Sequence, residues 1–404
     1  MRTIFHIDVN SAYLSWTSVE NLKTGNGPDL REIPAIIGGD QKTRHGVVLA
    51  KSIPAKKFGI HTGEPVVNAL KKCPNLIMAP PNHDLYHAYS RRMMDFLHSL
   101  TPDIEQVSID ECFLDFTGIS HRYPSPYAAA RYIKDEIHSR FGFTVNVGIS
   151  SNKLLAKMAS DFEKPDKVHT LYEEEIPSKM WALPVSELFM LGKKTIPKLY
   201  AMGIKTIGDL AKQDKEYMIK IFGKHGLLMW EYSNGIDNSE VKYIQEKPKG
   251  IGNSVTLPID VREKVALEKV ILTLVEQVAY RLRKYNMYAN VVNVQLRTSE
   301  FKDFSHQKKL SSSTANTKDI YNTAKELLNE MYKNGTPIRL VGVRVDNLVE
   351  KGEVQISLFG NTENEKKQEK LDSVVDQLKQ KYGYNSITRA GKLHSEDVIK
   401  LKDV

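Results

Sequence analysis

Acidic residues interrupt two otherwise apolar stretches of this sequence, and their chemistry is the first feature to explain. Asp8 lies within "TIFHIDV", and the neighbours Asp110 and Glu111 lie within "VSIDECFLDF". An ionised carboxylate that is buried without a partner is strongly destabilising, so we expect a cation beside these groups. Mg²⁺ prefers oxygen ligands, and a pair of such ions can stabilise the attacking and leaving oxygens of a phosphoryl transfer. The three carboxylates therefore predict a divalent-metal site.

Whether Asp110 and Glu111 can act together depends on the local shape of their strand. Neighbouring residues of a regular strand point to opposite faces, so both side chains reach one site only at a bulge, a strand end or a hairpin tip. In the alternative interpretation, one acid pairs with a lysine or arginine and the other faces water, as charged residues commonly do. These two residues alone leave both interpretations open.

Alternating helices and strands must position these carboxylates. Short apolar runs predict strands, and apolar residues spaced three and four apart predict helices. This order of elements, with acids on more than one strand, predicts an α/β sheet that carries a metal site. The predicted strands are 3–9, 107–116 and 144–150, and the predicted helices are 11–23, 83–100, 126–141 and 152–162.

The pattern changes beyond residue 166. Residues 183–212 alternate short helical stretches with glycine turns, and 242–254 is a lysine-rich stretch that we interpret as an exposed linker. The order that follows, βαββαβ, is that of a ferredoxin-like or split βαβ unit. Its predicted strands are 253–259, 290–299, 304–312 and 338–347, and its predicted helices are 263–286 and 318–333.

Length and composition favour a multidomain cytoplasmic protein. A chain of 404 residues is too long for one compact core. The sequence has no apolar run long enough for a membrane helix, and Cys73 and Cys112 make neither a disulfide framework nor a zinc site. The net charge of +8 permits nucleic-acid binding, although a mildly basic surface is equally compatible with it.

Three longer motifs follow one another in a fixed order, "FHIDVNSAYLSW", "VSIDECFLDF" and "NVGISSNKLLAKMASDFEKPD". Together with "VVLAKSIPAKKFGI", "SVTLPIDV" and "KYGYNSITRAG", they resemble the Y-family DNA polymerases, in particular the DinB or DNA polymerase IV branch. The resemblance spans nearly the whole chain. It implies template-directed transfer of nucleotides from dNTPs to a primer 3′-hydroxyl, including error-prone translesion synthesis in DNA repair.

The family fold is a multidomain α/β right hand, and the resemblance implies where its parts lie. We expect a palm, small fingers, a helix-hairpin-helix thumb and a little finger with the βαββαβ order. The expected ranges are 1–20 and 77–166 for the palm, 21–76 for the fingers, 167–241 for the thumb, 242–252 for a basic linker, 253–349 for the little finger and 350–404 for a C-terminal tail.

The resemblance also implies a catalytic centre. By position, Asp8, Asp110 and Glu111 take the role of the catalytic metal ligands, joined by the backbone carbonyl of Val9. The implied cofactors are two Mg²⁺ ions that bridge the primer 3′-hydroxyl and the incoming dNTP. Asn10 stands where many relatives have a further acid, and we assign no ligand role to its side chain.

Three other residues match family positions that contact the incoming nucleotide. Tyr13 matches the steric gate, an aromatic ring beneath the sugar, although a tyrosine there could also be a core residue. Lys56 and Lys164 match triphosphate-binding positions, with an ordinary exposed lysine as the alternative for each. Ile53 stands where many relatives have tyrosine, so one phosphate hydrogen bond is expected to be missing or replaced.

The glycine turns of the expected thumb resemble hairpins whose backbone N–H groups bind DNA phosphates. We assign this contact to Gly192 and Gly203, with Lys193 and Lys194 adding positive charge. Met190 replaces the first glycine of the usual hairpin, so phosphate contact there is expected to be weaker.

The stretch "QISLFG" resembles the peptide by which bacterial polymerases bind the sliding clamp. Gln355 would supply an amide, and Leu358 and Phe359 would supply two adjacent apolar anchors. In the alternative, Leu358 and Phe359 pack onto the little finger. Beyond DNA, dNTP and the clamp, we expect no membrane contact and a monomeric protein.

Other functions could use such a fold. A DNA-binding architectural protein with an inactive palm is opposed by the complete set of Asp8, Asp110 and Glu111. A nucleotide cyclase shares a palm-like sheet and two metals, but it needs neither a helix-hairpin-helix module nor a second basic domain. A metal-dependent nuclease would also use clustered carboxylates. Primer extension separates all of these alternatives.

Overall fold

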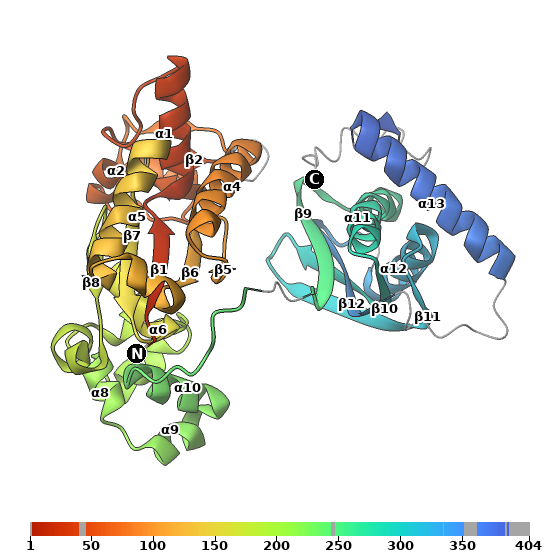
Figure 1. The fold of residues 1–404 in the computed structure, drawn as a ribbon. Coiled ribbons are helices and arrows are strands. Elements are labelled where there is room, and N and C mark those ends of the chain that lie inside the picture. The colour runs from red at the N-terminus through yellow and green to blue at the C-terminus, as the bar shows by residue number, and fades with distance from the viewer. Residues whose placement is uncertain are drawn as a thin grey trace. The chain divides into compact units, whose positions relative to one another are not determined.

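The computed structural model describes two compact units. The described residues are 2–39, 46–243, 247–333, 335–350, 362–383 and 386–387. The first unit consists of Met1–Gly39 and Val47–Gln245, and the second contains Glu246–Val404 together with Asp40–Gly46 (Figure 1). Within the described part of the chain, no helix is long and apolar enough to cross a membrane.

A five-stranded sheet forms the centre of the first unit, with β1 as its middle strand (Figure 1). β1 pairs antiparallel with β6 on one side and with β7 on the other, whereas β7 and β8 are parallel. The strands β1 and β7 are almost entirely buried, and this burial explains their apolar sequences. In spatial order the strands are β5 (Ile104–Gln106), β6 (Glu111–Asp115), β1 (Ile4–Val9), β7 (Val145–Ser150) and β8 (Val168–Thr170).

Helices cover both faces of this sheet. On one face, Phe5, Ile7 and Val9 of β1 share a hydrophobic core with residues of α1, α4 and α5. On the other face, Ile4 and Phe113 pack against Ala156 of α6. The odd- and even-numbered residues of β1 therefore face different layers. The helices are α1 (Ala12–Thr24), α4 (His83–Leu100), α5 (Pro126–Phe141) and α6 (Lys153–Asp161), close to the ranges predicted from spacing.

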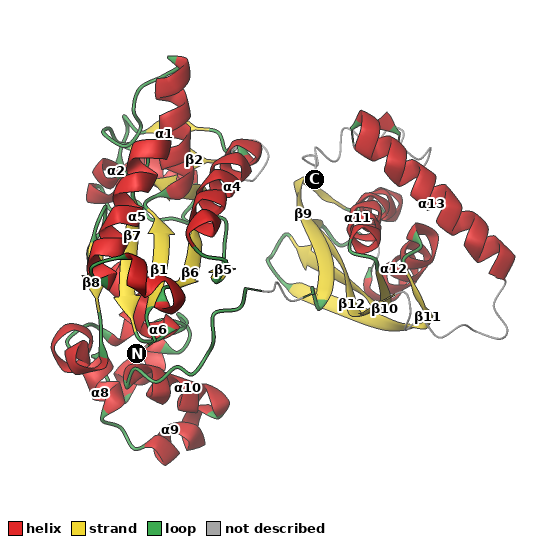
Figure 2. Cartoon of the chain, in the orientation of Figure 1, coloured by secondary structure: helices red, strands yellow, loops and turns green. Residues whose placement is uncertain are grey.

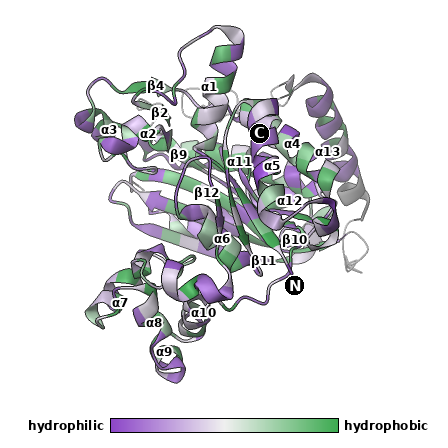
Figure 3. Cartoon of the chain, turned by 60° about the vertical axis from the view of Figure 1, so that its left-hand side comes forward, coloured by the Kyte–Doolittle hydropathy of each residue, from purple (hydrophilic) through white to green (hydrophobic). Residues whose placement is uncertain are grey.

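Helix α6 approaches the sheet very closely because of one glycine. A Cβ atom at Gly148 of β7 would lie only 2.0 Å from the carbonyl oxygen of Ala156 and 2.5 Å from the backbone nitrogen of Ser160. The side chain of Asn152 begins the helix by accepting a hydrogen bond from the N–H of Leu155. Figure 3 shows hydrophobic and hydrophilic residues together on α6, as expected for a helix with one buried face.

A smaller, three-stranded sheet lies in the range expected for the fingers. β2 (Ala35–Gly38) pairs antiparallel with β3 (Val48–Lys51) and parallel with β4 (Ile77–Ala79). The short helices α2 (Ile53–Lys57) and α3 (Val66–Lys72) accompany these strands. Because β4 belongs to this sheet, the small sheet extends to Ala79, slightly beyond the boundary that we expected at residue 77.

Short helices follow the large sheet, as the glycine-punctuated sequence predicts (Figure 2). In α8, Thr206 and Asp209 form a capping box in which each side chain accepts a backbone N–H of the other. Gly208 packs against Trp181, since a Cβ atom there would lie 2.9 Å from the Trp181 Cβ. The helices are α7 (Ile196–Ala201), α8 (Ile207–Ala211), α9 (Lys215–Phe222) and α10 (Lys224–Ser233).

The second unit has the predicted βαββαβ order and a single antiparallel sheet. In the sheet order β11-β10-β12-β9, β12 lies between β9 and β10, the two strands that α11 joins. Likewise, β10 lies between β11 and β12, the two strands that α12 joins, and this is the split βαβ arrangement. One continuous core joins both helices to the sheet. The elements are β9 (Gly250–Val261), α11 (Lys264–Lys284), β10 (Met287–Thr298), β11 (Asp303–Thr314), α12 (Thr317–Met331) and β12 (Ile338–Glu350).

A charged helix of the tail, α13 (Thr362–Tyr382), packs onto this second unit. The Arg283 guanidinium donates hydrogen bonds of 2.6 and 2.8 Å to the Asp376 carboxylate. The Asp372 carboxylate accepts the backbone N–H of Thr317 at 3.0 Å, at the start of α12. Polar contacts therefore attach this helix to the second unit. The proposed clamp peptide, with Gln355, Leu358 and Phe359, lies outside the described residues.

Candidate active site

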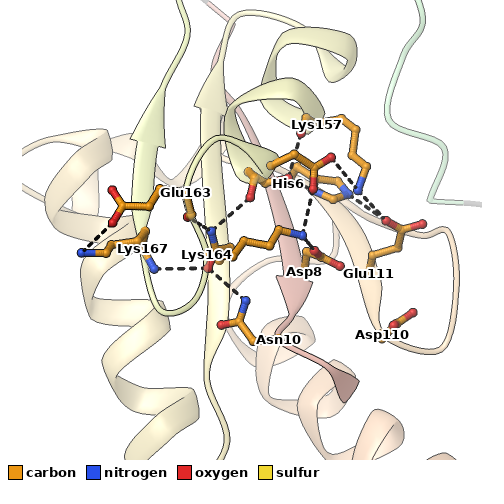
Figure 4. Close-up of polar contacts among 12 residues, drawn as sticks. His6, Asp8, Asn10, Asp110, Glu111, Lys157, Glu163, Lys164 and Lys167 are labelled. Carbon is orange, nitrogen blue, oxygen red and sulfur yellow. Dashed lines mark hydrogen bonds and ion pairs between the residues drawn. The ribbon is translucent and has the colours of Figure 1, made fainter. Parts of the chain in front are cut away.

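Two of the predicted carboxylates lie directly opposite each other. Asp8 of β1 and Glu111 of β6 are register partners in an antiparallel pair. Opposite residues in such a pair point to the same face, with Cβ atoms about 4.5–5.5 Å apart. Both side chains therefore meet on the face covered by α6 (Figure 4). Two like charges in this position repel each other, so cations are required nearby.

Asp110 lies in a turn, and this corrects the single strand that we expected over 107–116. The structure has two strands here, β5 and β6, and β6 begins only at Glu111. The Ser108 hydroxyl donates to Asp110 Oδ1 at 2.6 Å and accepts the backbone N–H of Glu111 at 3.1 Å. The Val9 N–H donates to the Asp110 carbonyl at 3.0 Å. The alternation of a regular strand thus does not separate Asp110 from Glu111.

Basic side chains neutralise two of the three acids. Lys164 is ion-paired with Asp8 and also, at 2.8 Å, with Asp161. Lys157 Nζ lies 3.1 Å from Glu111 Oε2. Among the described residues, Asp110 makes no ion pair, and no three acidic, histidine or cysteine side chains already converge as a metal cage. A cation entering this site would therefore compete with the lysines.

Glu111 and Asp110 differ in how readily they ionise. A hydrogen bond from His6, with the charge of Lys157, lowers the pKa of Glu111 to about 2. Burial raises the pKa of Asp110, and the charges of Asp8 and Glu111 add to this effect. Burial alone would lower the pKa of Lys164, but the charges of Asp8 and Asp161 outweigh it and raise that pKa. Asp110 is thus the carboxylate that most lacks a cation.

A cavity of about 810 Å³ is lined by Asp8 and Asp110 together with residues of the small sheet. Its size is within the range of pockets that bind small molecules and cofactors. Glu111 does not line it, although it lies beside Asp8 in the sheet. The predicted site residues that line this cavity are Asp8, Val9, Tyr13, Lys56, Asp110 and Lys164.

Tyr13 is partly exposed at this cavity and is not a fully buried core residue. Its ring stacks on Tyr86, with ring centroids 4.3 Å apart and planes at 7°. His83 meets the same ring edge-on at 6.0 Å. The Tyr86 hydroxyl lies 3.1 Å from Thr17 Oγ1. One face of Tyr13 is therefore supported by an aromatic partner that is itself held in place.

The Asn10 side chain makes three hydrogen bonds to other residues. Its Oδ1 accepts the Thr144 hydroxyl and the Asp166 N–H, each at 2.9 Å. Its Nδ2 donates to Asn146 Oδ1 at 3.0 Å. The side chain thus ties β1 to the loop that carries Lys164, in keeping with our decision not to assign it as a metal ligand.

Lys51 is a site residue that the sequence analysis missed. It is the last residue of β3 and lines the same cavity as Lys56 and Ile53. Within the described residues it has no ion pair, and its hydrogen bond is a long one, 3.4 Å, to Thr62 Oγ1. Burial, followed by the charge of Lys56, lowers the pKa of Lys51. The alternation of "VLAK", which buries Val48 and Ala50, could have indicated that Lys51 faces the cavity.

The first glycine turn of the thumb range has an unusual backbone. Met190 adopts φ +67°, a left-handed conformation that glycine normally provides. The side chain is 60% exposed, so packing does not explain why it is a methionine. Gly192, Lys193 and Lys194 lie in the turn before α7, and their backbone N–H groups donate no hydrogen bond to any described residue. Gly203 has φ +81° between α7 and α8, and its N–H donates to the Tyr200 carbonyl at 3.0 Å.

Comparisons with known proteins show which family the chain resembles. Residues 7–161 match the model of the impB/mucB/samB family, and residues 248–358 match the model of its C-terminal domain. A DNA polymerase IV of Clostridium acetobutylicum is 48% identical over 396 residues, covering 98% of this chain and 99% of that protein. One from Alkaliphilus oremlandii is 37% identical, covering 96% and 98%. A solved Y-family DNA polymerase chimera aligns with a TM-score of 0.73 and 24% identity, covering 86% of this chain and all of the chimera, which supports the fold.

Proposed function

The chain belongs to the Y-family of DNA polymerases, in the DNA polymerase IV branch, and we propose that Asp8, Asp110 and Glu111 are its catalytic carboxylates. It is a DNA-directed DNA polymerase that carries out template-directed translesion synthesis, and it requires a divalent metal. Primer–template DNA and dNTPs are its substrates. The alternatives of an inactive architectural protein and a nucleotide cyclase are not favoured.

The observation that carries the proposal is the grouping of three carboxylates at one end of the β1–β6 pair. Asp8 and Glu111 face each other across the pair, and Asp110 adjoins them from the turn. Asp110 is desolvated and has no ion pair with any described residue. A partly buried carboxylate without a cation suits a hard divalent ion.

We assign two Mg²⁺ ions to this site, held by Asp8, Asp110, Glu111 and the Val9 carbonyl. When bound, such ions would stabilise the attacking 3′-oxygen and the leaving pyrophosphate oxygen of the nucleotidyl transfer. The residues that line the cavity would position the substrates for this transfer. Lys164 neutralises Asp8 in this structure. It would also contact the dNTP triphosphate, because Asp8 and the triphosphate would lie at the same cavity.

We assign the dNTP triphosphate to the lysines at the small sheet. Lys51 and Lys56 both line the cavity, and neither has an ion pair among the described residues. The charge of Lys56 acts on Lys51 more strongly than the opposite charge of Glu64, and two neighbouring cations of this kind favour an anionic ligand. Lys51 would supply the contact that is lost where Ile53 replaces the tyrosine of many relatives. Tyr13, supported by Tyr86, would exclude the 2′-hydroxyl of ribonucleotides.

We assign DNA phosphate contacts to Gly192, Lys193, Lys194 and Gly203. In the turn before α7, the backbone N–H groups of Gly192, Lys193 and Lys194 donate no hydrogen bond to any described residue, and both lysines are exposed. These features support the assignment. Gly203 would contribute mainly by permitting the left-handed turn, because its N–H already has an acceptor. We also propose that the peptide containing Gln355, Leu358 and Phe359 binds the sliding clamp and that the protein acts as a monomer.

Primer extension tests the proposed function. The purified chain should lengthen a labelled primer on a template when both dNTPs and Mg²⁺ are present. Reactions without DNA test for a cyclase, and reactions without dNTPs test for a nuclease. Cyclic nucleotide formation or DNA cleavage, without extension, would overturn the proposal.

A further inference from the structure

His6 is a buried polar residue of the site that the proposed chemistry does not use. It lies on β1 two residues before Asp8 and is only 1% exposed. Residues two apart on a strand share a face, so His6 points to the same face as Asp8 (Figure 4). A buried imidazole is stabilised only if its nitrogens find partners. The two partners of His6 are Ser160 and Glu111.

The partners of His6 determine which ring nitrogen carries a proton. Nε2 lies 3.3 Å from Glu111 Oε2, and an ionised carboxylate can only accept a hydrogen bond. Nε2 must therefore be an N–H group. Nδ1 lies 2.8 Å from Ser160 Oγ, whose single hydroxyl proton can be donated either to Nδ1 or to the Lys157 carbonyl, which is also 2.8 Å away.

Helix α6 supplies both the residue that orients His6 and a second contact to Glu111. Gly148 is the register partner of His6, and its missing side chain lets Ser160 come close to the ring. Lys157, one turn before Ser160, lies 3.1 Å from the same Oε2 of Glu111. No described residue donates a hydrogen bond to Glu111 Oε1. The two contacts thus hold one carboxylate oxygen and leave the other available.

We propose that His6 is a positioning residue, which holds Oε2 of Glu111 through its Nε2–H so that Oε1 is presented to a divalent cation. Ser160 fixes the ring orientation, and Lys157 is the second anchor of the same oxygen. This inference rests on the proposed metal role of Glu111. Outer contacts that orient a metal-binding side chain typically change metal affinity by about 10- to 100-fold.

The protonation pattern of His6 tests the inference without any catalysis. Nitrogen NMR of the metal-free wild-type chain, labelled at histidine and assigned with His6→Gln, reports which ring nitrogen carries the proton. We expect a protonated Nε2 in a ring that exchanges slowly with water. An unprotonated Nε2, with the proton on Nδ1, would overturn the inference because it could not donate to Glu111.

Metal binding by a matched pair of variants tests the functional consequence. The amide nitrogen of glutamine can occupy the place of Nε2, whereas phenylalanine fills the site without a donor. We expect His6→Phe to weaken Mn²⁺ binding, measured by electron paramagnetic resonance, by about tenfold or more. We expect His6→Gln to retain most of the affinity, and both variants to bind DNA normally.

Asp110→Ala separates failure of this inference from failure of the proposed function. If Asp110→Ala loses Mn²⁺ binding but a folded His6→Phe variant binds Mn²⁺ like the wild type, His6 does not position Glu111. If Asp110→Ala also binds Mn²⁺ like the wild type, the proposed metal site itself is wrong. Thermal unfolding of each variant without metal shows whether it is folded. If His6→Phe does not fold, the NMR measurement on the wild-type chain still tests the inference.

Discussion

Tyr13 presents only part of its ring to the cavity that Asp8 and Asp110 line. Its other face stacks on Tyr86, so the ring cannot turn aside without losing that contact. We predict that Tyr13→Ala incorporates ribonucleotides at least about tenfold more readily, which corresponds to a loss of about 1.4 kcal/mol in discrimination. Single-nucleotide insertion with paired dNTP and rNTP substrates measures this ratio.

A tyrosine elsewhere on the surface provides the control for this prediction. Tyr127 is 52% exposed and belongs to α5, and it does not line the cavity. Tyr127→Ala should leave the selection between sugars unchanged. If Tyr13→Ala also leaves it unchanged, Tyr13 is a packing residue and not a gate.

Lys51 and Lys56 offer a second test at the level of single residues. We predict that Lys51→Ala and Lys56→Ala each raise the KM for dNTP by about five- to tenfold, roughly 1–1.4 kcal/mol, because each removes one charged contact to the triphosphate. DNA affinity should change little. Steady-state kinetics with varied dNTP, beside a DNA-binding titration, provides both quantities.

The matched control is Lys57, which follows Lys56 in α2 but does not line the cavity. Lys57→Ala should leave the KM for dNTP unchanged. If Lys51→Ala instead weakens DNA binding at an unchanged KM for dNTP, Lys51 contacts the nucleic acid backbone and not the triphosphate.

The sequence allows the carboxylates and Tyr13 to be singled out, because acids in apolar strands and an aromatic residue after them are unusual and belong to recognisable motifs. It does not reveal His6 or Lys51. A histidine in a strand reads as an ordinary half-buried residue, and its contact with Ser160 joins positions 154 residues apart. Such long-range contacts depend on how α6 packs, which no local pattern encodes.

Among the elements, the β5–β6 hairpin shows why local patterns mislead. Val107 and Ile109 make the stretch look like one continuous strand, yet both precede β6, and Val107 is 50% exposed. Helix α4 was predictable to its ends, because its buried face repeats at helical spacing and Asn82 caps its first turn. Apolar residues mark burial reliably, but they do not mark where a chain reverses.

The two glycine turns beside α7 differ in backbone conformation, and this difference leads to a prediction about stability. A Cβ atom would meet nothing within 4 Å at either Gly203 or Gly192, but only Gly203 has a positive φ, +81°. Gly203→Ala should therefore destabilise the first unit by about 1 kcal/mol through backbone strain. Gly192→Ala should be neutral or slightly stabilising, because alanine reduces the freedom of the unfolded chain.

Thermal unfolding of the two alanine variants side by side tests this difference. Equal melting temperatures would show that the turn at Gly203 does not need a left-handed residue. A loss of DNA affinity in Gly192→Ala, at unchanged stability, would instead support close approach of a phosphate to that turn.

At the scale of the whole molecule, the order of elements was more predictable than their connections in space. The βαββαβ order of the second unit follows from alternating apolar runs, and its sheet order, β11-β10-β12-β9, is the split βαβ arrangement expected for that order. The tail contains a charged helix, α13. That α13 attaches through Arg283, Asp372 and Asp376 was not predictable, since these partly buried ion pairs join charged residues that sequence patterns assign to the surface.

The peptide before α13 yields a prediction for the assembled polymerase. Leu358→Ala combined with Phe359→Ala should abolish stimulation of synthesis by the sliding clamp, because the two apolar anchors of the peptide are removed. Primer extension without the clamp and the melting temperature should stay the same. The matched control is Leu371→Ala with Val374→Ala, which alters two residues of α13 that are each 51% exposed.

The clamp assignment has a clear contrary outcome. If the Leu358 and Phe359 double variant melts at a lower temperature and still responds to the clamp, these residues belong to the fold of the second unit. Loss of stimulation in the α13 control variant alone would place the clamp contact on the helix.

The central claim is that Asp8, Asp110 and Glu111 provide the catalytic site of this polymerase, and Asp110→Ala tests it most directly. Primer extension and DNA binding should be measured on the same preparation, at matched salt, because phosphate contacts depend on ionic strength. We predict that Asp110→Ala loses extension and binds primer–template DNA like the wild type, since we assign the DNA phosphate contacts to Gly192, Lys193, Lys194 and Gly203. Near-normal extension by Asp110→Ala would contradict the account.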